Sequence, residues 1–545
     1  MGNGMQKTVR GFLRAEGQGL INEDGVEVLL RGVGFGGWFL PEGYMWRFPA
    51  QGDRPRRIER MIEELIGPEK ARIFWETYYR RFISKSDIRQ IAQEGFNSVR
   101  IPLNTRFLLK SDDPVVYHIE HLQILDEVIE WCKEYELYVI LDLHGAPGGQ
   151  TGTNIDDSER DQPELFTDPK NRELTVALWR MLAKRYRDEW IVAGYDLLNE
   201  PLPDWFSCYY DEVMPLYCEI VKAIREVDQR HMIILEGVHW ATDWSIFTEK
   251  IDDNILLQFH KYWNNPDTES IQAYLDKRAE WDVPIFMGEG GENNKEWYTG
   301  AFRLFEDHNI SWNFWTWKKM ETTNSPCSIV MPQGWDRLVD YLEGGAKPDA
   351  GVSEAILWEY LDNIVFEHCI YRPEVVCSIF RRPPVRIPAI FYGYKGEGKS
   401  FGLQDKAPSN LQFRMNDGTA IHPVAGIMEK PNFHHGAGES WLTDEWLCVS
   451  LATGDWLAYE FEIAQGMETM LYAISLHLLA TTENGGSVAV SVDGVLVGRV
   501  ETTDLEWETV QIQKALDLEP GPHELILRAE SPIDFQWLEL GVEQA

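Results

Sequence analysis

Short apolar segments alternate with amphipathic helical segments along residues 25–320. A continuous apolar run is typical of a strand that is covered on both faces. Between these runs, Leu125, Val128, Ile129 and Cys132 fall at i, i+3, i+4 and i+7, which predicts a helix with one buried face. The predicted strands are 26–35, 95–102, 138–144, 195–198, 231–236, 255–260, 284–289 and 310–317.

Eight strands, each followed by a helical segment, predict a parallel sheet of the α/β class. Spread over about 350 residues, they fit a (β/α)8 TIM barrel with insertions, whose active site lies at the carboxyl ends of the strands. A doubly wound open sheet is the alternative. It is disfavoured because no glycine-rich phosphate-binding fingerprint follows a predicted strand.

The pattern changes at the proline-rich stretch 381–388, which marks a domain boundary or a linker. Beyond this stretch the apolar positions alternate with a period of two, as in half-buried strands. One predicted hairpin contains Val488, Val490 and Val492, a turn at Asp493-Gly494, and then Val495 and Val497. We therefore predict two domains, a barrel at 1–380 and an all-β jelly-roll sandwich at 381–545.

The chain is rich in aromatic residues, with 22 Trp, and it carries a formal net charge of −37. Sugar rings pack well on aromatic platforms because their C–H faces are apolar. The negative charge argues against nucleic acid, which requires a basic footprint, and against anionic membrane surfaces. It suits neutral substrates and gives no indication of the oligomeric state.

The seven cysteines form no CxxC motif, and their number is odd. Buried or free thiols are therefore expected, in place of a disulfide framework or a zinc site, and no cofactor is predicted. The first ten residues lack the apolar core of a secretory signal, and no apolar run approaches the length that spans a bilayer. We expect a cytoplasmic protein, or a secreted one if a signal has been removed.

The predicted strand 195–198 ends in Asn199-Glu200-Pro201. Pro201 cannot donate to a strand ladder, so Glu200 is expected at the strand tip, where a concave site can use it. The alternative is a solvated glutamate at an ordinary strand end. The other predicted strands also end in polar or aromatic residues, namely Arg100, His144, His260 with Tyr262, Glu289 and Trp315. At this edge of a barrel, such residues indicate a catalytic site.

Two carboxylates on opposite sides of a barrel mouth have the arrangement that cleaves a glycosidic bond. We predict Glu200 as the acid/base, because a neighbouring carboxylate raises its pKa. Glu289 is the predicted nucleophile, kept ionised by Arg100 and by a hydrogen bond from Tyr262.

The remaining strand-end residues are predicted to bind the sugar. Asn199 is expected to bond the 2-hydroxyl, an interaction that strengthens in the transition state. His144 and His260 would hold neighbouring hydroxyls or orient the acid, and Trp315 would form the floor of the subsite. Glu236 is interpreted as a structural carboxylate. A metal-dependent hydrolase built on the two histidines is disfavoured, because no HxH or HExxH pair is present.

Six motifs, in this order along residues 25–320, resemble glycoside hydrolase family 5. They are Val-Arg-Ile-Pro (99–102), Leu-Asp-Leu-His-Gly-Ala-Pro-Gly (141–148), Asn-Glu-Pro (199–201), His-Lys-Tyr (260–262), Gly-Glu (288–289) and Ser-Trp-x-x-Trp (311–315). The resemblance implies a retaining (β/α)8 enzyme with Glu200 as acid/base and Glu289 as nucleophile. It also implies subsite roles for Arg100, His144, Asn199, His260, Tyr262 and Trp315.

Within that family, the segments 36–39 (Gly-Gly-Trp-Phe) and 142–150 are most similar to exo-β-1,3-glucanases. This similarity implies β-glucan oligosaccharides or β-glucosides as substrates and a role for Glu42 in holding the terminal glucose. An endo-β-1,4-glucanase remains the alternative within the family. A non-catalytic carbohydrate-binding protein is the rival class, which the presence of both glutamates disfavours.

The long insertion after Trp38 contains Tyr44, Trp46 and Phe48. These aromatic side chains either wall off one end of a cleft, which would favour short or terminal substrates, or pack beneath the loop. The sequence favours neither interpretation.

In the second domain, the segments 454–460, 490–494, 521–525 and 534–538 resemble carbohydrate-binding modules of families 6 and 35. In those modules an aromatic platform usually lies where this chain has Ser450 and Asp504, and a calcium-binding Glu-Ala-Glu lies where it has Pro388-Ala389-Ile390. We therefore interpret the domain as structural, with Asp534 as the remaining candidate for a polar ligand contact.

Overall fold

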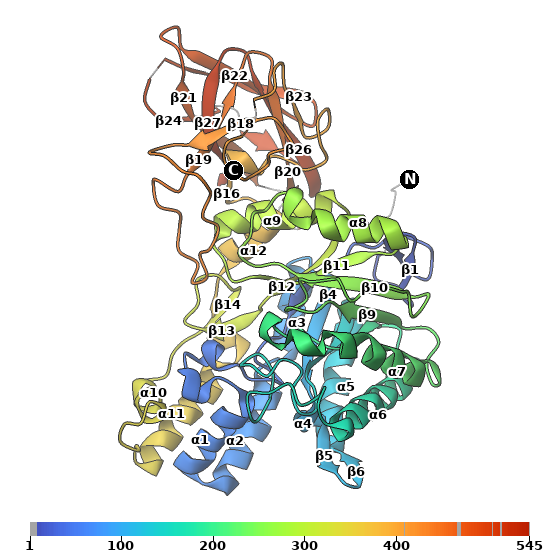
Figure 1. Cartoon of the computed structure of the whole chain (residues 1–545). Coiled ribbons are helices and arrows are strands. Elements are labelled where there is room, and N and C mark those ends of the chain that lie inside the picture. Colours follow the sequence, from blue (N-terminus) through green and yellow to red (C-terminus); the bar gives the residue numbers. More distant parts are fainter. Residues whose placement is uncertain (1–7, 408, 466–469, 504, 513–514, 544–545) are drawn as a thin grey trace. The chain divides into compact units, whose positions relative to one another are not determined.

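The computed structural model describes residues 8–407, 409–465, 470–503, 505–512 and 515–543 (Figure 1). The described chain forms two compact units. The first comprises residues 8–261, 276–290 and 311–371, and the second comprises 262–275, 291–310 and 372–543. The boundary between domains at 380/381 stays a prediction.

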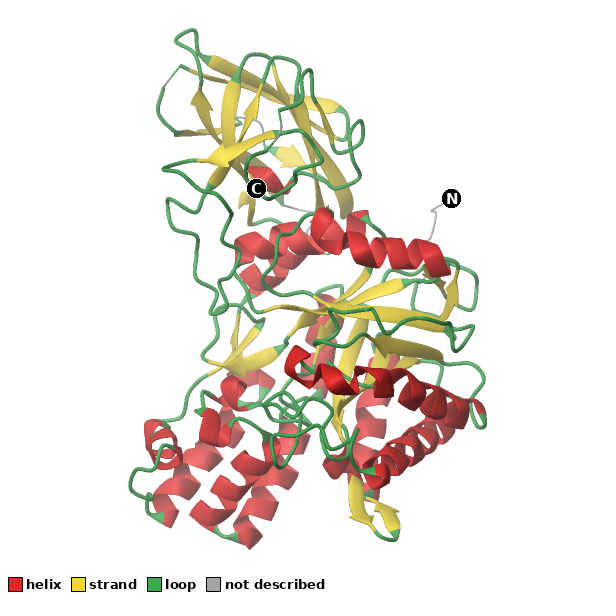
Figure 2. Ribbon diagram, in the orientation of Figure 1, coloured by secondary structure: helices red, strands yellow, loops and turns green. Residues whose placement is uncertain are grey.

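The first unit contains a closed barrel of eight strands that run parallel (Figure 2). In chain order the strands are β3 (Arg31–Gly34), β4 (Ser98–Asn104), β7 (Tyr138–Gly145), β8 (Val192–Asp196), β9 (Met232–Glu236), β10 (Ile255–His260), β11 (Ile285–Gly291) and β12 (Ser311–Trp315). Each strand lies beside its successor, and β12 closes the barrel against β3. The predicted (β/α)8 barrel is therefore confirmed, since the apolar strands are covered on both faces.

Helices follow most of the strands. They include α3 (Lys85–Gln93), α4 (Thr105–Leu108), α5 (Ile119–Glu134), α6 (Pro169–Tyr186), η3 (Asp204–Glu212), α7 (Val213–Arg225), η4 (Glu269–Ile271), α8 (Gln272–Trp281) and α9 (Lys295–Asp307). The predicted apolar face of α5 is buried, because Leu125, Val128, Ile129 and Cys132 are at most 2% exposed. The strand β9 differs from the prediction, because a loop, residues 237–254, follows it in place of a helix. In this loop His239, Trp240 and Ala241 adopt the left-handed conformation, which a right-handed helix cannot include.

The insertion after Trp38 forms η1 (Gly43–Trp46), η2 (Ala50–Gly52), α1 (Pro55–Ile66) and α2 (Pro68–Arg81), and the two α-helices pack against α11 (Ala350–Asn363). Trp46 is 1% exposed and lies among Trp335, Tyr78 and Tyr360, with ring centroids 4.5–6.2 Å away. Phe48 stacks on Trp335 at 5.0 Å. Of the three aromatic residues, Trp46 and Phe48 therefore pack beneath the loop, whereas Tyr44 is 38% exposed.

Shorter elements complete the first unit. They are β1 (Arg14–Glu16), β2 (Gly19–Ile21), the hairpin of β5 (Leu109–Asp112) and β6 (Val115–Tyr117), β13 (Lys318–Met320), β14 (Cys327–Ile329), α10 (Asp336–Leu342), η5 (Phe366–His368) and β15 (Ile370–Tyr371). None of the helices in the described chain is long and apolar enough to cross a membrane. All seven cysteines are free thiols, as predicted.

The second unit contains two antiparallel sheets, together with α9, α12 (Pro373–Phe380) and η6 (Ala389–Phe391). One sheet has β18 (Ala420–Pro423), β19 (Leu447–Leu451), β27 (Ile533–Glu543), β21 (Leu471–Ala480) and β24 (Glu508–Gln511) in this order, with β16 (Val385–Pro388) and β25 (Leu516–Asp517) at its margins. The other has β17 (Phe401–Gly402), β20 (Trp456–Ile463), β26 (Gly521–Ala529), β22 (Gly486–Val492) and β23 (Val495–Thr502). Tyr459 of β20 packs edge-on against Phe535 of β27, so the sheets face each other. The predicted all-β fold of the region after the barrel is confirmed.

The predicted hairpin is also present. Val492 of β22 pairs with Val495 of β23, and Asp493 and Gly494 adopt φ angles of 51° and 77°. Positive φ at both central residues is what a tight two-residue hairpin turn requires.

Candidate active site

The strand register gathers polar side chains at the carboxyl ends of neighbouring barrel strands. Asp142 of β7 lies opposite Asp196 of β8, and Gln258 of β10 lies opposite Glu236 of β9. A register shift after Phe259 then places His260 opposite Glu289 of β11. Because the strands are parallel, these residues occupy one edge of the barrel.

Arg100 lies at the centre of this cluster and is fully buried. Its guanidinium reaches four carboxylates and one amide, at 2.5–3.2 Å: Asp142, Asp196, Glu236, Glu289 and Asn199. Burial alone would lower the pKa of Arg100, but the four carboxylates raise it well above its ordinary value. A rigid fork of five N–H donors suits such a contact better than a lysine would.

One guanidinium cannot balance four carboxylates, and the buried aspartates respond accordingly. Burial raises the pKa of Asp142 and of Asp196 well above the ordinary value, and the charge of Glu236 adds to the shift. Burial would also raise the pKa of Glu236, but His260 and Arg100 lower it. The pKa values of the two aspartates and of Glu236 are therefore shifted in opposite directions.

Glu200 and Glu289 meet at His260. The Nδ1 atom of His260 lies 2.6 Å from Oε1 of Glu200 and 3.7 Å from Oε2 of Glu289. One carboxylate oxygen of each glutamate and one ring nitrogen of His260 all lie within 4.8 Å of one another. Residues separated widely in sequence therefore form a compact pair of carboxylates at the barrel mouth.

Burial raises the pKa of Glu200 to about 7, although the hydrogen bond with His260 opposes the shift. Burial would lower the pKa of His260, but the charges of Glu236 and Glu289 raise it well above its ordinary value. Glu200 is thus largely protonated below neutral pH, in contact with a cationic ring.

The backbone holds Glu200 in a strained conformation. Its φ is 45°, in the left-handed region that side chains with a Cβ rarely adopt, and its N–H donates to Oε2 of Glu236 at 2.7 Å. Strain of this kind persists only where the surroundings fix it, and it is concentrated at functional sites. Glu236 therefore fixes the direction of Glu200, a role that its position in the sequence alone does not reveal.

A second chain of contacts runs from Asp142 to Trp315. Burial lowers the pKa of His144 to about 3, so the ring is neutral. Its Nδ1 lies 2.7 Å from Oδ2 of Asp142, and its Nε2 accepts from Nδ2 of Asn199 at 3.3 Å. The imidazole also stacks on Trp315, with centroids 5.4 Å apart and planes at 5°. Arg100 donates to Oδ1 of Asn199, and Nδ2 of Asn199 donates to His144, so the orientation of the Asn199 amide is fixed.

Trp315 packs across the first barrel strand because that strand has no side chain there. A Cβ at Gly34 or at Gly36 would lie 2.6 Å from the indole ring. The indole Nε1 donates to the hydroxyl of Tyr44 at 3.0 Å, which brings the loop after Trp38 to the barrel mouth. Tyr44 is therefore the aromatic residue of the insertion that reaches the site.

Two further residues with predicted roles lie on neighbouring segments. Glu42 precedes η1 in the same loop as Tyr44 and is 3% exposed. Tyr262 belongs to the second unit, where its carbonyl accepts from Nδ2 of Asn293 at 3.0 Å. Sugar binding by Glu42 and the hydrogen bond from Tyr262 to Glu289 stay predictions.

Two tryptophans follow Glu200 and Glu236 in the chain, Trp205 at the start of η3 and the half-buried Trp240 in the loop after β9. The N–H of His239 donates to the carbonyl of Leu202 at 2.8 Å, which ties the two loops together. Trp205 is 60% exposed and meets Trp240 edge-on at 5.3 Å. The indole rings of Trp205 and Trp240 therefore lie together in the segments that follow Glu200 and Glu236.

Asp142, Asp196 and Gln258 are part of the cluster but are missing from the residues predicted from the sequence. The sequence does contain a signal for Asp142 and Gln258. Each lies two positions before a predicted site residue, His144 or His260, and residues two apart in a strand share a face of the sheet. Asp196 has no such partner, so the signal for it is only a polar residue inside an apolar run.

A parallel barrel with two glutamates at one end indicates a glycosidase, and comparison with known proteins supports that class of enzyme. Residues 63–321 match the model of cellulase (glycosyl hydrolase family 5). Glycoside hydrolases of this kind act on carbohydrate, and the predicted enzyme class is confirmed.

Three similar proteins differ in their named activities. A β-xylosidase of Phanerodontia chrysosporium is 27% identical over 343 residues, which cover 56% of this chain and 71% of that protein. Endoglucanase C of Acetivibrio thermocellus is 33% identical over 212 residues, covering 38% and 57%. A probable glucan 1,3-β-glucosidase A of Aspergillus clavatus is 29% identical over 277 residues, covering 48% and 64%. The chain therefore spans less than two thirds of the endoglucanase and of the glucosidase, and the relatives differ in activity.

Proposed function

We propose that the chain is a retaining, exo-acting β-glucosidase that hydrolyses β-glucan oligosaccharides or β-glucosides. The observation that supports this most strongly is the closeness of the two glutamates, since one carboxylate oxygen of Glu200 lies within 4.8 Å of one carboxylate oxygen of Glu289. Carboxyl groups about 5–5.5 Å apart leave room for direct attack on the sugar, whereas inverting enzymes keep them about 6.5–9.5 Å apart to admit a water.

In the first step of this mechanism, Glu289 attacks the anomeric carbon while Glu200 transfers its proton to the glycosidic oxygen. The bond to the leaving group breaks, and a covalent glycosyl–enzyme ester forms. In the second step, the ionised Glu200 takes a proton from water, and the oxygen of that water displaces Glu289 from the anomeric carbon. Each step inverts the anomeric carbon, so the product keeps the β configuration.

The surrounding groups support these roles. Arg100 donates to Oε1 of Glu289 at 2.5 Å, which holds this carboxylate in place for attack. The hydrogen bond between His260 and the Glu200 carboxyl, and the one from the Glu200 N–H to Glu236, hold the acid in position. The amide of Asn199 has a second N–H besides the one directed at His144, and this N–H suits the 2-hydroxyl of the sugar.

The pH dependence follows from the pKa of Glu200. Because the acid must be protonated to assist the leaving group, kcat/KM is expected to fall tenfold per pH unit above about 7, the pKa to which burial raises Glu200. The measurement is kcat/KM from pH 5 to 9 with a β-glucoside of an alcohol. A flat profile across neutral pH would contradict the assignment.

Trp205 and Trp240 suit the leaving-group side, because the acid lies on that side of the scissile bond. The Trp205→Ala variant is expected to raise KM for a β-glucan disaccharide by about 2- to 12-fold, the worth of one aromatic contact, with little change for methyl β-glucoside. Ile119→Ala, which removes an exposed apolar side chain on α5, is the matched control. Equal effects on both substrates would place Trp205 outside the binding path.

The test of the function is a panel of laminarin oligomers, cello-oligosaccharides, gentiobiose, aryl β-glucosides and aryl β-xylosides, with the product anomer followed by NMR. Release of β-glucose from chain ends supports the proposal. The relative named an endoglucanase supports the alternative, which predicts larger fragments from the interior of cello-oligosaccharides. Initial release of α-glucose would exclude retention.

A further inference from the structure

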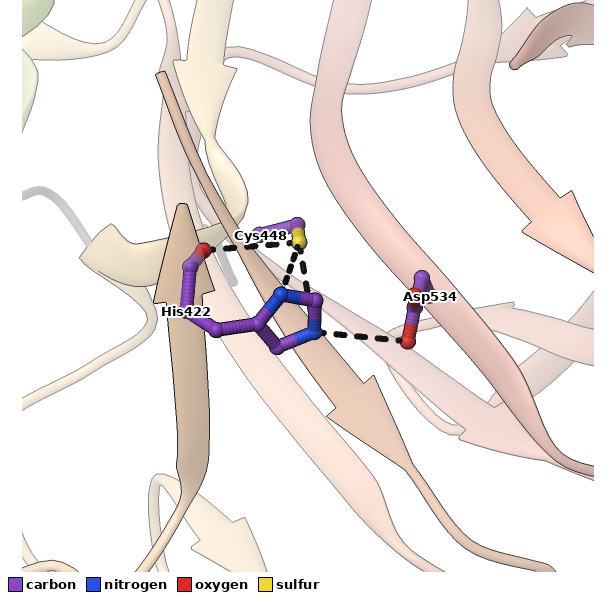
Figure 3. A group of neighbouring side chains, drawn as sticks. All are labelled: His422, Cys448 and Asp534. Carbon is purple, nitrogen blue, oxygen red and sulfur yellow. Dashed lines mark hydrogen bonds and ion pairs between the residues drawn. The ribbon is translucent and has the colours of Figure 1, made fainter. Parts of the chain in front are cut away.

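Three strands of the second unit bring a histidine, a cysteine and an aspartate to one place (Figure 3). His422 on β18 lies directly opposite Cys448 on β19, and Ser450 on β19 lies directly opposite Asp534 on β27. Cys448 and Ser450 are two positions apart, so they share a face of the sheet. The register of three strands therefore directs all four side chains to the same face.

This face is the one turned away from the core between the sheets. The alternate residues of β19, Leu447, Val449 and Leu451, are at most 2% exposed and belong to the core. Cys448 is nevertheless fully buried and Asp534 is 9% exposed, whereas the side chain of His422 is 43% exposed. The group is therefore enclosed on one side and reachable from solvent along His422.

The separations match those of ligands around one small ion. The Sγ atom of Cys448 lies 3.5 Å from Nε2 of His422, Nε2 lies 3.7 Å from Oδ1 of Asp534, and the ligand atoms of all three residues lie within 4.8 Å of one another. In a tetrahedral zinc site with bonds of about 2.0–2.3 Å, neighbouring ligand atoms are roughly 3.3–3.6 Å apart. Shifts of a few tenths of an ångström to about 1 Å complete the triangle.

Contacts around the group resemble the supports that metal ligands usually have. Nδ1 of His422 lies 3.3 Å from the carbonyl oxygen of Pro423, and Nε2 lies 2.8 Å from the hydroxyl of Ser450. An ion bound at Nε2 would replace the proton that Nε2 shares with this hydroxyl, while the Nδ1 contact persists. The hydroxyl of Ser450 donates to Oδ1 of Asp534 at 2.5 Å. The Sγ atom of Cys448 lies 3.4 Å from Nδ1 and 3.5 Å from Nε2 of His422. Rotation of the His422 ring about its Cβ–Cγ bond, a soft torsion, can therefore direct Nε2 at an ion that Cys448 also binds.

We propose that His422, Cys448 and Asp534 form a Zn²⁺ site with one open coordination position. One sulfur, one imidazole nitrogen and one carboxylate oxygen suit zinc, whereas Ca²⁺ and Mg²⁺ take oxygen ligands. Three protein ligands leave a fourth position for water or an external ligand, on the side where His422 meets solvent. The absence of a CxxC or HxH motif hides this site in the sequence, because its ligands come from three strands.

The experiment uses the full chain after treatment with a chelator, titrated with ZnCl₂ in a calorimeter and with CoCl₂ in a spectrophotometer. One equivalent of Zn²⁺ is expected to bind, and Co²⁺ is expected to give a thiolate-to-metal charge-transfer band. Loss of a residue that merely hydrogen-bonds to a metal ligand typically weakens metal binding by about 10–100-fold. Loss of the ligand itself in Cys448→Ser should therefore weaken Zn²⁺ binding at least about 100-fold, and it should also remove the charge-transfer band. Cys208→Ser, which removes an exposed thiol, is the matched control and should change neither.

Two further readouts separate this site from the active site. Glu200, His260 and Glu289 are also close enough to hold an ion, but they contain no sulfur and cannot produce the cobalt band. Asp534→Asn keeps the thiol and should weaken Zn²⁺ binding at least tenfold, while the kcat of glycoside hydrolysis stays unchanged. Absence of saturable Zn²⁺ binding, or equal affinity in Cys448→Ser and the unmodified protein, would overturn the proposal.

Discussion

The Glu289→Ala variant is expected to fold normally and to lose at least about 10⁴-fold in kcat, because removal of a catalytic nucleophile leaves little beyond substrate binding. Arg100 keeps three of its four carboxylate partners in this variant, namely Asp142, Asp196 and Glu236. The buried cation therefore remains compensated, and the melting temperature should change little. The measurement is kcat on an aryl β-glucoside, with thermal unfolding measured in parallel.

Small anions sharpen this test. Azide can enter the space that the carboxylate of Glu289 leaves and attack the anomeric carbon from the same face, so an α-glycosyl azide is expected. Glu280→Ala is the matched control, because its carboxylate is exposed and pairs with Lys277 on the same helix. Wild-type rates in a folded Glu289→Ala variant would show that a different group attacks the sugar.

Replacing Glu200 should have an effect that depends on the leaving group. With a poor leaving group such as a second sugar, Glu200→Ala is expected to reduce kcat/KM by about 10²–10⁴-fold, the usual contribution of a general acid. With a dinitrophenyl β-glucoside, which needs no proton to depart, kcat/KM should fall far less. The fall in kcat/KM above pH 7 should also disappear, because the group responsible for it is absent.

In Glu200→Ala the second step lacks a base, so the glycosyl–enzyme accumulates and kcat and KM fall together. Azide needs no deprotonation and is expected to restore turnover with a β-glycosyl azide as product. The opposite anomers in the two variants separate the roles of Glu200 and Glu289. A uniform loss with all leaving groups would show that Glu200 positions substrate without transferring a proton.

Much of the fold follows from local patterns. The apolar strands and their spacing predict the barrel, since a strand buried on both faces needs no tertiary information to be recognised. The same holds for the hairpin at Asp493-Gly494, where two residues determine the turn. The loop after β9 does not follow from local patterns, because nothing in its sequence excludes a helical turn. Its left-handed residues begin at His239, whose N–H donates to the carbonyl of Leu202 in the neighbouring loop.

Some residues of the candidate site can likewise be predicted from the sequence, whereas others are placed only by the tertiary structure. Glu200 and Glu289 can be found from the sequence because each ends a strand, and all strands of a parallel barrel end at one edge. The roles of Glu236 and Asp196 cannot be found from the sequence. These roles depend on the strand register, which brings the two carboxylates to Arg100. The environment that raises the pKa of Glu200 is likewise a product of burial, which a sequence pattern does not measure.

The amino-acid sequence by itself therefore determines the order of strands, the residues at their ends and the class of chemistry, because periodicity and strand length are local properties. Only the tertiary structure decides which side chains meet. Strand register and barrel closure place Arg100 among four carboxylates, bury Trp46 while leaving Tyr44 at the site, and bring His422, Cys448 and Asp534 together. These contacts join residues far apart in the chain, and no local pattern specifies them.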